Sequence, residues 1–312
     1  MTKCTSRLAP SPTGALHLGN ARTFLMNWAL AKQRGWALPL RVEDLDGPRI
    51  KVDSARAGID ILAWLGMTYD GEPLYQSIDL EPYRDAMRTL AAGGHTYASA
   101  LTRSEVRAAA SAPHADDHEV VFPPSLRPDD APHRTFVDGD EHLRFIVESD
   151  PVTIDDMVHG TSIHDLASTV GDFVVWTKRH TPAYQLAVVV DDARQGVTDV
   201  VRGDDLLGSA ARQTLLYRAL NLTPPRWWHV PLVLGDDGHR LAKRHGDTRV
   251  SLYRDLGIPA DRIIGLCAWW SGVMEERAPM SIEEFGERFD IQRMSRSPVR
   301  FTAEDDQWLR DI

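Results

Sequence analysis

The stretch Arg7-Leu8-Ala9-Pro10-Ser11-Pro12-Thr13-Gly14-Ala15-Leu16-His17-Leu18-Gly19-Asn20 decides the fold. It predicts a strand over residues 4–9 that ends at Pro10, because Pro10 and Pro12 cannot continue a helix or a central ladder. The apolar residues from 18 to 32 then recur near helical spacing, and Gly35 stops the run. We therefore expect a strand that leads through a turn into the start of a helix.

The same alternation continues downstream and predicts the fold class. Residues 38–42 form a second predicted strand that ends in an acidic turn, and an apolar helical pattern follows up to Gly66. Strands and helices that alternate with short turns favour an α/β fold with a doubly wound parallel sheet. Further strands are expected at residues 143–147, 152–154, 187–190 and 230–234, and further helices at 212–220 and from 259 onward.

Composition divides the chain into three predicted regions. Residues 1–82 and 181–240 carry the sheet domain. Residues 83–180 form an inserted α+β subdomain, in which a capping box at residues 102–105 opens a short helix. Proline and aspartate are frequent at residues 113–133, which is typical of a loop. Residues 241–312 are expected to form a basic loop followed by a helical segment.

Charge and cysteine content narrow the function classes. The chain has 312 residues, a formal net charge of −10 and two cysteines, Cys4 and Cys267. No apolar run approaches the roughly 20 residues that span a membrane, and the first residues lack a secretory pattern, so a reducing, cytoplasmic location is predicted. The acidic total disfavours broad nucleic-acid binding, so an RNA partner must contact local basic faces. A monomer is expected.

The opening of the predicted helix has the features of an anion site. Free backbone amides and the helix dipole favour negative charge at that end. His17 could donate to a phosphate, and Gly19 leaves room for a nucleotide against the backbone. A proline- and glycine-rich loop with a surface histidine is the alternative interpretation, but the whole stretch from Arg7 to Asn20 favours the anion site.

A second element far downstream carries concentrated positive charge. His239-Arg240-Leu241-Ala242-Lys243-Arg244 follows a predicted strand and the turn at residues 235–238. A loop that bears Lys243 suits the neutralisation of charge that develops on a phosphate during transfer. A solvated basic turn would explain the cluster equally well in isolation. Its position directly after a strand and a turn favours the phosphate-binding interpretation.

Three further side chains are predicted to gather at one ligand pocket. Glu43 stands at the carboxyl end of the second strand, where open α/β sheets bind ligands, and it could hold an ammonium group or only cap a helix. Arg202 ends another predicted strand, and its planar fork could bind a carboxylate through two hydrogen bonds. Tyr184 could line the pocket or merely pack. Their common placement favours a shared ligand.

The sequence predicts no resident metal site. The pairs His159 with His164 and His114 with His118 lack a thiolate or carboxylate partner at a finger-like spacing. No serine or cysteine nucleophile with a supporting histidine is indicated either. The chemistry is therefore expected to depend on positioning and electrostatics.

At these residues the chain resembles class I aminoacyl-tRNA synthetases, specifically the glutamate-specific group. Residues 10–20 resemble their HIGH region, and residues 240–244 resemble their KMSKS loop, with Ala242 in place of the usual serine. Residues 41–46, 183–192 and 200–207 are also similar to motifs of that group. The resemblance implies a Rossmann-like catalytic domain with an inserted subdomain and a helical stem segment.

The resemblance also implies a role for each site residue. It implies catalytic roles for His17, Gly19 and Lys243, with ATP and Mg²⁺ as cofactors and no zinc. For glutamate it implies Arg7, Leu8, Ala9, Pro10, Ser11, Glu43, Tyr184 and Arg202. For ATP it implies Pro12, Thr13, Gly14, His17, Asn20, Arg240, Leu241, Lys243 and Arg244.

One departure concerns the zinc module that opens with Cys-x-Cys in that family. The matching positions here are Ala98 and Ala100, which cannot bind a metal ion. We therefore expect a subdomain without zinc, in which the loop at residues 113–133 and local packing replace the metal.

The short chain resembles the glutamyl-Q subgroup, which attaches glutamate to the queuosine base of tRNA(Asp). The expected function is therefore ATP-dependent formation of glutamyl-adenylate followed by transfer to that base. An alternative is a synthetase-derived ligase that transfers glutamate to a small molecule or another acceptor that is not tRNA. A non-catalytic RNA-binding paralogue is disfavoured, because His17, Gly19 and Lys243 are all present.

Overall fold

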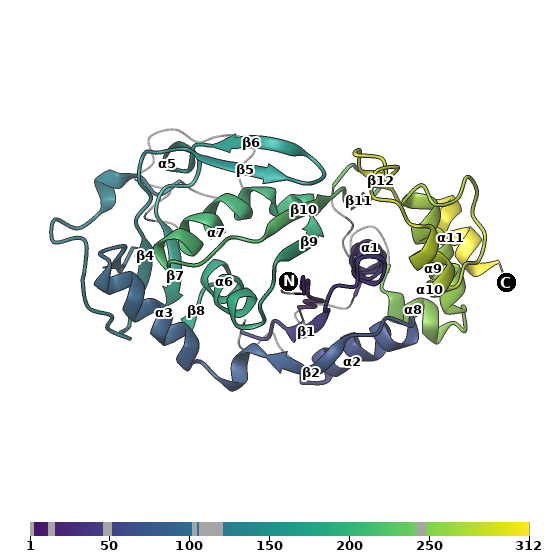
Figure 1. The fold of residues 1–312 in the computed structure, drawn as a ribbon, viewed down its shortest axis with the longest axis horizontal. Coiled ribbons are helices and arrows are strands. Elements are labelled where there is room, and N and C mark those ends of the chain that lie inside the picture. The colour runs from purple at the N-terminus through teal and green to yellow at the C-terminus, as the bar shows by residue number, and fades with distance from the viewer. Residues whose placement is uncertain are drawn as a thin grey trace.

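The computed structural model describes residues 3–11, 16–45, 52–101, 105, 121–239, 241 and 248–311. The molecule is elongated, with the amino terminus near its middle and the last helices at one end (Figure 1). Its helices are α1 (Leu18–Arg34), α2 (Val52–Trp64), α3 (Glu81–Ala92), α5 (Leu166–Thr169), α6 (Tyr184–Arg194), α7 (Leu207–Ala219), α8 (Val250–Asp255), α9 (Ala260–Trp270), α10 (Ile282–Arg288) and α11 (Ala303–Arg310).

The strands form four sheets among the described residues. They are β1 (Pro39–Val42), β2 (Asp70–Tyr75), β3 (Thr96–Ser99), β4 (His142–Phe145), β5 (Val152–Asp156), β6 (Gly160–His164), β7 (Phe173–Thr177), β8 (Thr181–Pro182), β9 (Asp199–Gly203), β10 (Arg226–Val230), β11 (Val233–Leu234) and β12 (Val299–Arg300). Short 3-10 turns are η2 (Gln76–Ile78), η3 (Pro124–Leu126) and η4 (Asp204–Leu206). The sheet orders are β1-β2, β6-β5-β10-β9, β11-β12 and β3-β4-β7-β8.

The amino-terminal segment lies between two parallel strand pairs. A parallel bridge joins Thr5 to Ala37, next to β1, which pairs in parallel with β2. On the other side, the amides of Thr198 and Asp199 donate to the carbonyl of Thr5 at 2.8 and 3.0 Å, and β9 continues in parallel with β10. The carboxyl ends of these parallel elements therefore lie at one edge, beside Glu43 and Arg202.

The sheet that contains β9 and β10 separates two hydrophobic cores. Side chains alternate between the faces of a strand, so Trp227 packs in the core around α6 and α7, while Trp228 packs in the core around α1 and α9. Val200 and Val201 divide in the same way. Both faces of this sheet are thus covered by apolar residues, as is usual for parallel strands in α/β proteins.

The antiparallel sheet β3-β4-β7-β8 and α3 form the end opposite the last helices (Figure 1). Aromatic rings fill it, with Phe145 stacked on Phe173 at 5.3 Å between ring centres. The hairpin β5-β6 belongs to the other sheet, because β5 pairs in parallel with β10 where Asp156 lies opposite Trp227. Hydrogen bonding therefore crosses the boundary predicted at residue 180, although the division into domains remains a prediction.

The carboxyl-terminal helices pack against α1. Gly265 on α9 lies so close to the chain at Ala278 that an added Cβ would be 1.9 Å from the Ala278 carbonyl oxygen. At Gly286 on α10, an added Cβ would lie 2.8 Å from the ring of Trp28 on α1. These contacts explain why glycine stands inside these two helices.

Several predicted elements are confirmed. The helix expected at residues 18–32 is α1, which ends at Gly35 in the left-handed conformation, φ 64°. The strands expected at 38–42, 143–147 and 152–154 are β1, β4 and β5, and the helices expected at 212–220 and from 259 onward are α7 and α9. The strand expected at 4–9 is an extended segment with bridges at Thr5 and Leu8. The predicted capping box lies mostly outside the described residues.

The strand predicted at residues 187–190 is wrong, because these residues belong to helix α6. Every residue from Gln185 to Asp192 is buried, so this helix has no polar face whose period could distinguish it from a buried strand. The strand predicted at 230–234 is divided instead, with Pro231 and Leu232 between β10 and β11.

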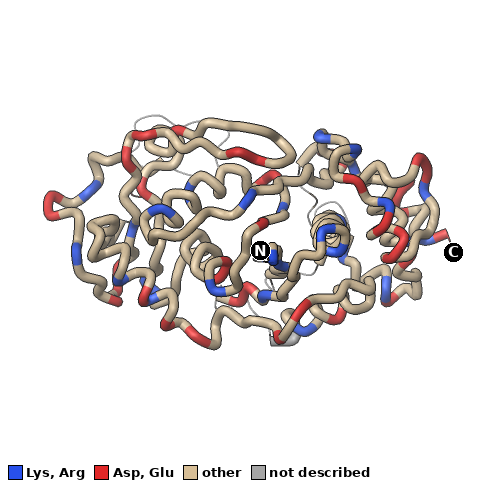
Figure 2. Tube along the Cα trace, in the orientation of Figure 1, with Lys and Arg blue, Asp and Glu red and all other residues tan. Residues whose placement is uncertain are grey.

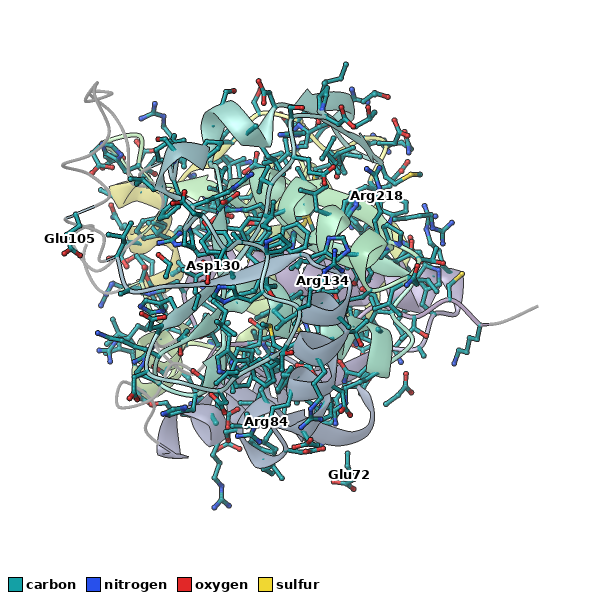
Figure 3. The ribbon with its side chains drawn as sticks, turned by 90° about the vertical axis from the view of Figure 1, so that its left-hand side faces the viewer. Glu72, Arg84, Glu105, Asp130, Arg134 and Arg218 are labelled. Carbon is teal, nitrogen blue, oxygen red and sulfur yellow. The ribbon has the colours of Figure 1, made fainter. Side chains whose placement is uncertain are left out.

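Charges of both signs are interspersed along the chain (Figure 2). At the end that carries the antiparallel sheet, Arg84, Asp130 and Arg134 lie on the same face (Figure 3).

Within the part of the chain that the structure describes, no helix is long and apolar enough to span a membrane.

Candidate active site

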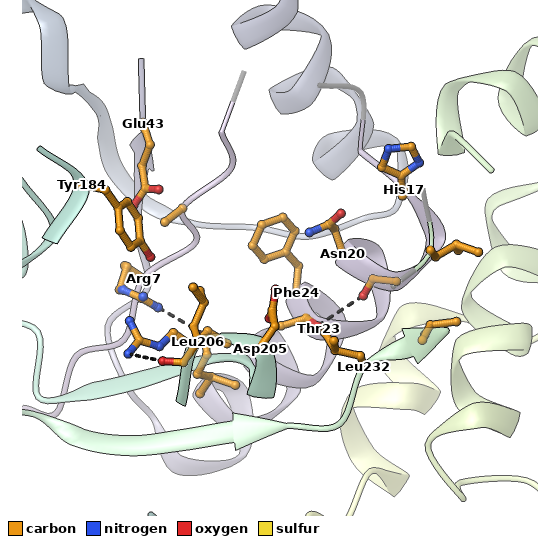
Figure 4. A pocket seen from close by; sticks show the side chains of 17 residues that line it. Arg7, His17, Asn20, Thr23, Phe24, Glu43, Tyr184, Asp205, Leu206 and Leu232 are labelled. Carbon is orange, nitrogen blue, oxygen red and sulfur yellow. Dashed lines mark hydrogen bonds between the residues drawn. The ribbon is translucent and has the colours of Figure 1, made fainter. Parts of the chain in front are cut away.

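A cavity of about 130 Å³ opens at the carboxyl edge of the parallel strands (Figure 4). A larger cavity of about 590 Å³ adjoins it and reaches α2. The two cavities share a wall, because both are lined by Ala9, His17, Asn20, Phe24, Glu43, Tyr184 and Leu206. The two cavities adjoin at the start of α1, and together they are called the cleft below.

Most of the described residues that were predicted for the site line this cleft. They are Arg7, Ala9, Pro10, Ser11, His17, Gly19, Asn20, Glu43, Tyr184, Arg202 and Leu241. Leu8 does not line it, because its side chain is fully buried in the core beneath α1. Other predicted positions lie outside the described residues, namely Pro12, Thr13, Gly14, Arg240, Lys243 and Arg244.

The start of α1 is held against the chain that follows the basic loop. His17 immediately precedes α1, and its Nδ1 lies 3.2 Å from the hydroxyl of Thr248. The amide of Leu18 donates to the carbonyl of Thr248 at 3.1 Å. Next to them, a Cβ at Gly19 would meet Val233 at 3.4 Å, so a larger residue there would press on β11.

The residues on both sides of the basic loop are fixed near this helix start. The amide of Leu241 donates to the carbonyl of Val233 at 3.2 Å, and Leu241 lines the smaller cavity. Beyond the loop, Arg249 forms an antiparallel bridge with His17. Two segments separated by more than two hundred residues in the sequence therefore meet at the mouth of the cleft.

A group of buried charges forms the floor of the cleft. Asp192 of α6 accepts from Arg7 Nε at 3.3 Å and from Arg41 Nη1 at 2.6 Å, and its side chain is fully buried. Arg41 Nη2 also donates to Glu43 at 3.2 Å. Two guanidinium groups and two carboxylates thus balance in charge, which limits the cost of burying them.

Glu43 is the acidic group of this floor that faces the cavity. Burial raises the pKa of Glu43 above its ordinary value, although the positive charges of Arg41 and Arg7 oppose the rise. A bound ammonium group would favour the ionised carboxylate for the same reason that these arginines do. The position therefore suits a cationic group of a ligand.

Arg202 and Tyr184 line the same cavity as Glu43, and Tyr184 lies beside Glu43 (Figure 4). Arg202 is 5% exposed and donates to Gln213 Oε1 at 2.8 Å and to the carbonyl of Leu206 at 3.2 Å, so its orientation is fixed. Tyr184 is 42% exposed. Partial desolvation inside the cavity and the negative charge of Glu43 raise the pKa of Tyr184, so its hydroxyl stays protonated and able to donate.

Sequence reasoning missed the residues that hold the cationic side chains. Asp192 ends a run of buried valines, which is a weak signal for an ion pair. His229 lies inside β10 and is fully buried, and it contacts Arg202 from the neighbouring strand. Phe24 and Leu206 line both cavities, but apolar residues at helical spacing give no sign of facing a ligand.

The described residues also bear on metal binding. Among them, no three His, Cys, Asp or Glu side chains come together in a way that could hold a metal ion. The Nε2 of His159 lies 3.8 Å from Asp204, which makes it an ion-pair candidate. Whether the chain lacks zinc stays a prediction from Ala98 and Ala100.

Comparisons with known proteins assign the chain to a family. The family described as tRNA synthetases class I (E and Q), catalytic domain, matches residues 3–308. A glutamyl-Q tRNA(Asp) synthetase of Rhodopirellula baltica is 41% identical over 96% of this chain and 97% of that protein. Its counterpart in Symbiobacterium thermophilum is also 41% identical, over 96% of each chain.

A solved structure shows the same fold. The glutamate-tRNA synthetase of Elizabethkingia anophelis superposes with a TM-score of 0.80 at 25% identity, and the match covers 99% of this chain and 70% of that one. The fold is thus the mixed α/β fold of a class I synthetase catalytic domain. The chain belongs to the class I tRNA synthetases for glutamate and glutamine, within the glutamyl-Q tRNA(Asp) synthetase group, a family of ligases that form aminoacyl-adenylates with ATP.

Proposed function

We propose that the chain activates L-glutamate with ATP and Mg²⁺ and transfers the glutamyl group to the queuosine base of tRNA(Asp). The observation that carries this proposal is the 41% identity to two relatives named for glutamyl-Q tRNA(Asp) over nearly their whole length. The cleft supports it, because it combines two carboxylates, two arginines and a helix start in one cavity.

In the glutamate subsite, the α-ammonium group and the side-chain carboxylate of the amino acid each have a partner. Glu43 takes the α-ammonium group, because it is the acidic side chain at the end of β1 that lines both cavities. Arg202 and the Tyr184 hydroxyl take the side-chain carboxylate. Arg7 and Ser11 close over the rest of the amino acid.

In the nucleotide subsite, the start of α1 holds the phosphates. Its free amides and dipole favour anions, and His17 and Asn20 line both cavities there. Gly19 leaves space for the nucleotide. We also assign Lys243 to the phosphates, because it follows by two positions Leu241, which lines the smaller cavity.

The reaction needs no side-chain nucleophile. An oxygen of the glutamate α-carboxylate forms a bond to the α-phosphorus of ATP. The bond between the α-phosphorus and the oxygen that bridges it to the β-phosphorus breaks, so pyrophosphate leaves. Lys243 stabilises the negative charge of that transition state. Mg²⁺ enters on the triphosphate, as it commonly does in nucleotide sites. A hydroxyl of the queuosine ring then attacks the carbonyl carbon, and AMP leaves.

We also propose a doubly wound sheet as the frame of this site. The hydrogen bonds of Thr5 to Thr198 and Asp199, and those of its neighbours Cys4 and Ser6 to Ala37, support an order β2, β1, residues 4–8, β9, β10, which reverses at the amino-terminal segment. Ligands in such sheets bind where the order reverses. The division into domains, the cytoplasmic location and the monomeric state are part of this proposal.

The test is transfer of labelled glutamate with ATP to tRNA(Asp) that contains or lacks queuosine. We expect label only in the queuosine-containing tRNA, and the same yield after its 3′-terminal adenosine is removed. Label in both tRNAs, or in neither, would contradict the proposal. Label found on a small molecule without tRNA would support the alternative ligase.

A further inference from the structure

A buried histidine links the cleft to the hairpin β5-β6. His229 of β10 lies directly opposite Arg202 of β9 in the parallel pair, and its side chain is fully buried. Arg202 Nε donates to His229 Nε2 at 3.0 Å. On the other side of the ring, His229 Nδ1 lies 2.7 Å from Asp156 Oδ2 of β5. The three residues form a chain from the hairpin to the cavity.

The partners of Asp156 fix which ring nitrogen carries the proton. Asp156 Oδ1 accepts from the amides of Val158 and His159 at 2.9 Å each, and Oδ2 accepts from the His229 amide at 3.1 Å. These bonds favour the ionised carboxylate, and hydrogen bonds lower its pKa in spite of burial. A carboxylate can only accept, so His229 Nδ1 carries the hydrogen and Nε2 offers its lone pair to Arg202.

This arrangement sets the direction of the Arg202 guanidinium. Nε is held by His229, Nη1 by Gln213 at 2.8 Å and Nη2 by the carbonyl of Leu206 at 3.2 Å. The ring of Trp227 lies 4.8 Å from the guanidinium carbon and supports its flat face. The contact with His229 depends on protonation. A proton on His229 Nε2 would remove the acceptor and place a second N–H against the N–H of Arg202 Nε.

We propose that His229, oriented by Asp156, is a positioning residue for amino-acid selection, because it accepts the Nε–H of Arg202 and aims the guanidinium at the side-chain carboxylate of glutamate. The inference rests on the proposed function, which gives Arg202 that carboxylate. It extends the selection of glutamate to Asp156, a residue of the hairpin β5-β6 that does not line the cleft.

Two isosteric substitutions separate positioning from packing. In His229→Gln the amide oxygen can occupy the place of Nε2 and accept from Arg202. In His229→Asn the shorter amide reaches only the place of Nδ1, so Arg202 loses its acceptor while Asp156 keeps a donor. His164→Asn is the matched control, since His164 is a partly buried histidine of β6 in the same sheet that bonds to Ser162 at 2.9 Å.

The readout is glutamate-dependent pyrophosphate exchange with the full chain. We expect His229→Asn to raise the KM for glutamate about tenfold or more, since a hydrogen bond to a charged group is lost. The KM for ATP and kcat should stay within about twofold. His229→Gln and His164→Asn should resemble the unsubstituted chain.

The outcomes decide the inference independently of the proposed function. If the unsubstituted chain shows no glutamate-dependent exchange, the proposed function fails. If it does show exchange, equal glutamate KM values in the Asn and Gln variants overturn the inference, as does a KM for ATP that rises in step. Unfolding of both variants, seen in a thermal melt, would assign His229 a purely structural role and would overturn it as well.

Discussion

At the scale of single residues, the site depends on charges that are buried together. Asp192 pairs with Arg7 and Arg41 through one oxygen, and Arg41 also pairs with Glu43. Removing one member of such a group leaves the others without compensation, which costs more than the intact group contributes. Buried polar contacts of this kind also fix the geometry of the side chains that face the ligand.

Asp192→Asn tests this balance. The amide oxygen can still accept from both arginines, but the negative charge is lost, so we expect the free energy of unfolding to fall by about 3 kcal/mol or more. Urea denaturation measures the change. Glu284→Gln is the control, because Glu284 forms an exposed pair with Arg288 at 2.5 Å, and such pairs contribute about 1 kcal/mol or less. Similar losses in both variants would contradict the prediction.

The titration of His229 predicts how stability depends on pH. Burial lowers the pKa of His229 below its ordinary 6.5, helped by the charges of Arg202 and His159 and opposed by Asp156. The unfolded chain therefore binds a proton that the folded chain excludes. The contribution of His229 to stability is complete above pH 6.5 and is lost as the pH falls through the folded-state pKa.

We expect the free energy of unfolding to decrease between pH 7 and pH 5, and to decrease less in His229→Gln, which cannot titrate. Urea denaturation at several pH values measures both slopes. His142 and His164 also have pKa values lowered by burial, so part of the slope should remain in the variant. An unchanged slope would show that His229 binds protons equally in the folded and unfolded chains, so that folding does not lower its pKa.

At the scale of elements, close backbone approach places the helices that support the cleft. Helix α9 needs glycine at position 265, because an added Cβ would lie 1.9 Å from the Ala278 carbonyl oxygen. At Gly58 of helix α2 there is space for a side chain, because an added Cβ would meet nothing within 4 Å. The same substitution should therefore have opposite effects in the two helices.

Gly265→Ala should lower the free energy of unfolding by about 1–3 kcal/mol, since backbone atoms must move apart. Gly58→Ala should raise it by about 0.5–1 kcal/mol, because alanine loses less conformational entropy in a helix. Thermal and urea unfolding of both variants provide the measurement. Equal effects would mean that the packing of α9 adapts to a larger residue.

The basic loop is the element that the mechanism needs most. Lys243→Ala should lower the rate of pyrophosphate exchange by about 100-fold or more, because one charged donor to the transition state is removed. The thermal unfolding temperature should not change. Lys178→Ala, which alters an exposed lysine after β7, is the control for a general charge effect. An unchanged exchange rate in Lys243→Ala would remove this lysine from the mechanism.

At the scale of the whole molecule, the cleft lies where distant segments meet. The amino-terminal segment, the end of β1, the start of α6 and the end of β9 each contribute a residue to its wall (Figure 4). The sheet of β9 and β10 has a core on each face, and these two cores fix the strand ends relative to α1. The strand ends that carry the charged residues of the site are therefore held by packing on both faces of the sheet.

The sequence by itself determined the elements whose signals are local. Helix α1 has a clear apolar period and ends at a glycine with φ 64°, so short-range preferences suffice to locate it. The spaced motifs around His17, Glu43, Tyr184 and Arg202 were predicted as one pocket, and the cavities are lined by all four. Such motifs are readable because the chemistry of a ligand restricts residue types at fixed positions.

Only the tertiary structure decided those features that depend on how a residue is surrounded by distant parts of the chain. Helix α6 was mistaken for a strand because burial on every side removes the polar face that would show its period. Leu8 belongs to the segment that was predicted to bind glutamate, yet its side chain packs in the core. The contacts of Asp192 and His229 join residues that lie far apart in the chain, so no local sequence pattern predicts them. Burial and long-range charge pairing are properties of the folded chain, and they become visible only when the fold is known.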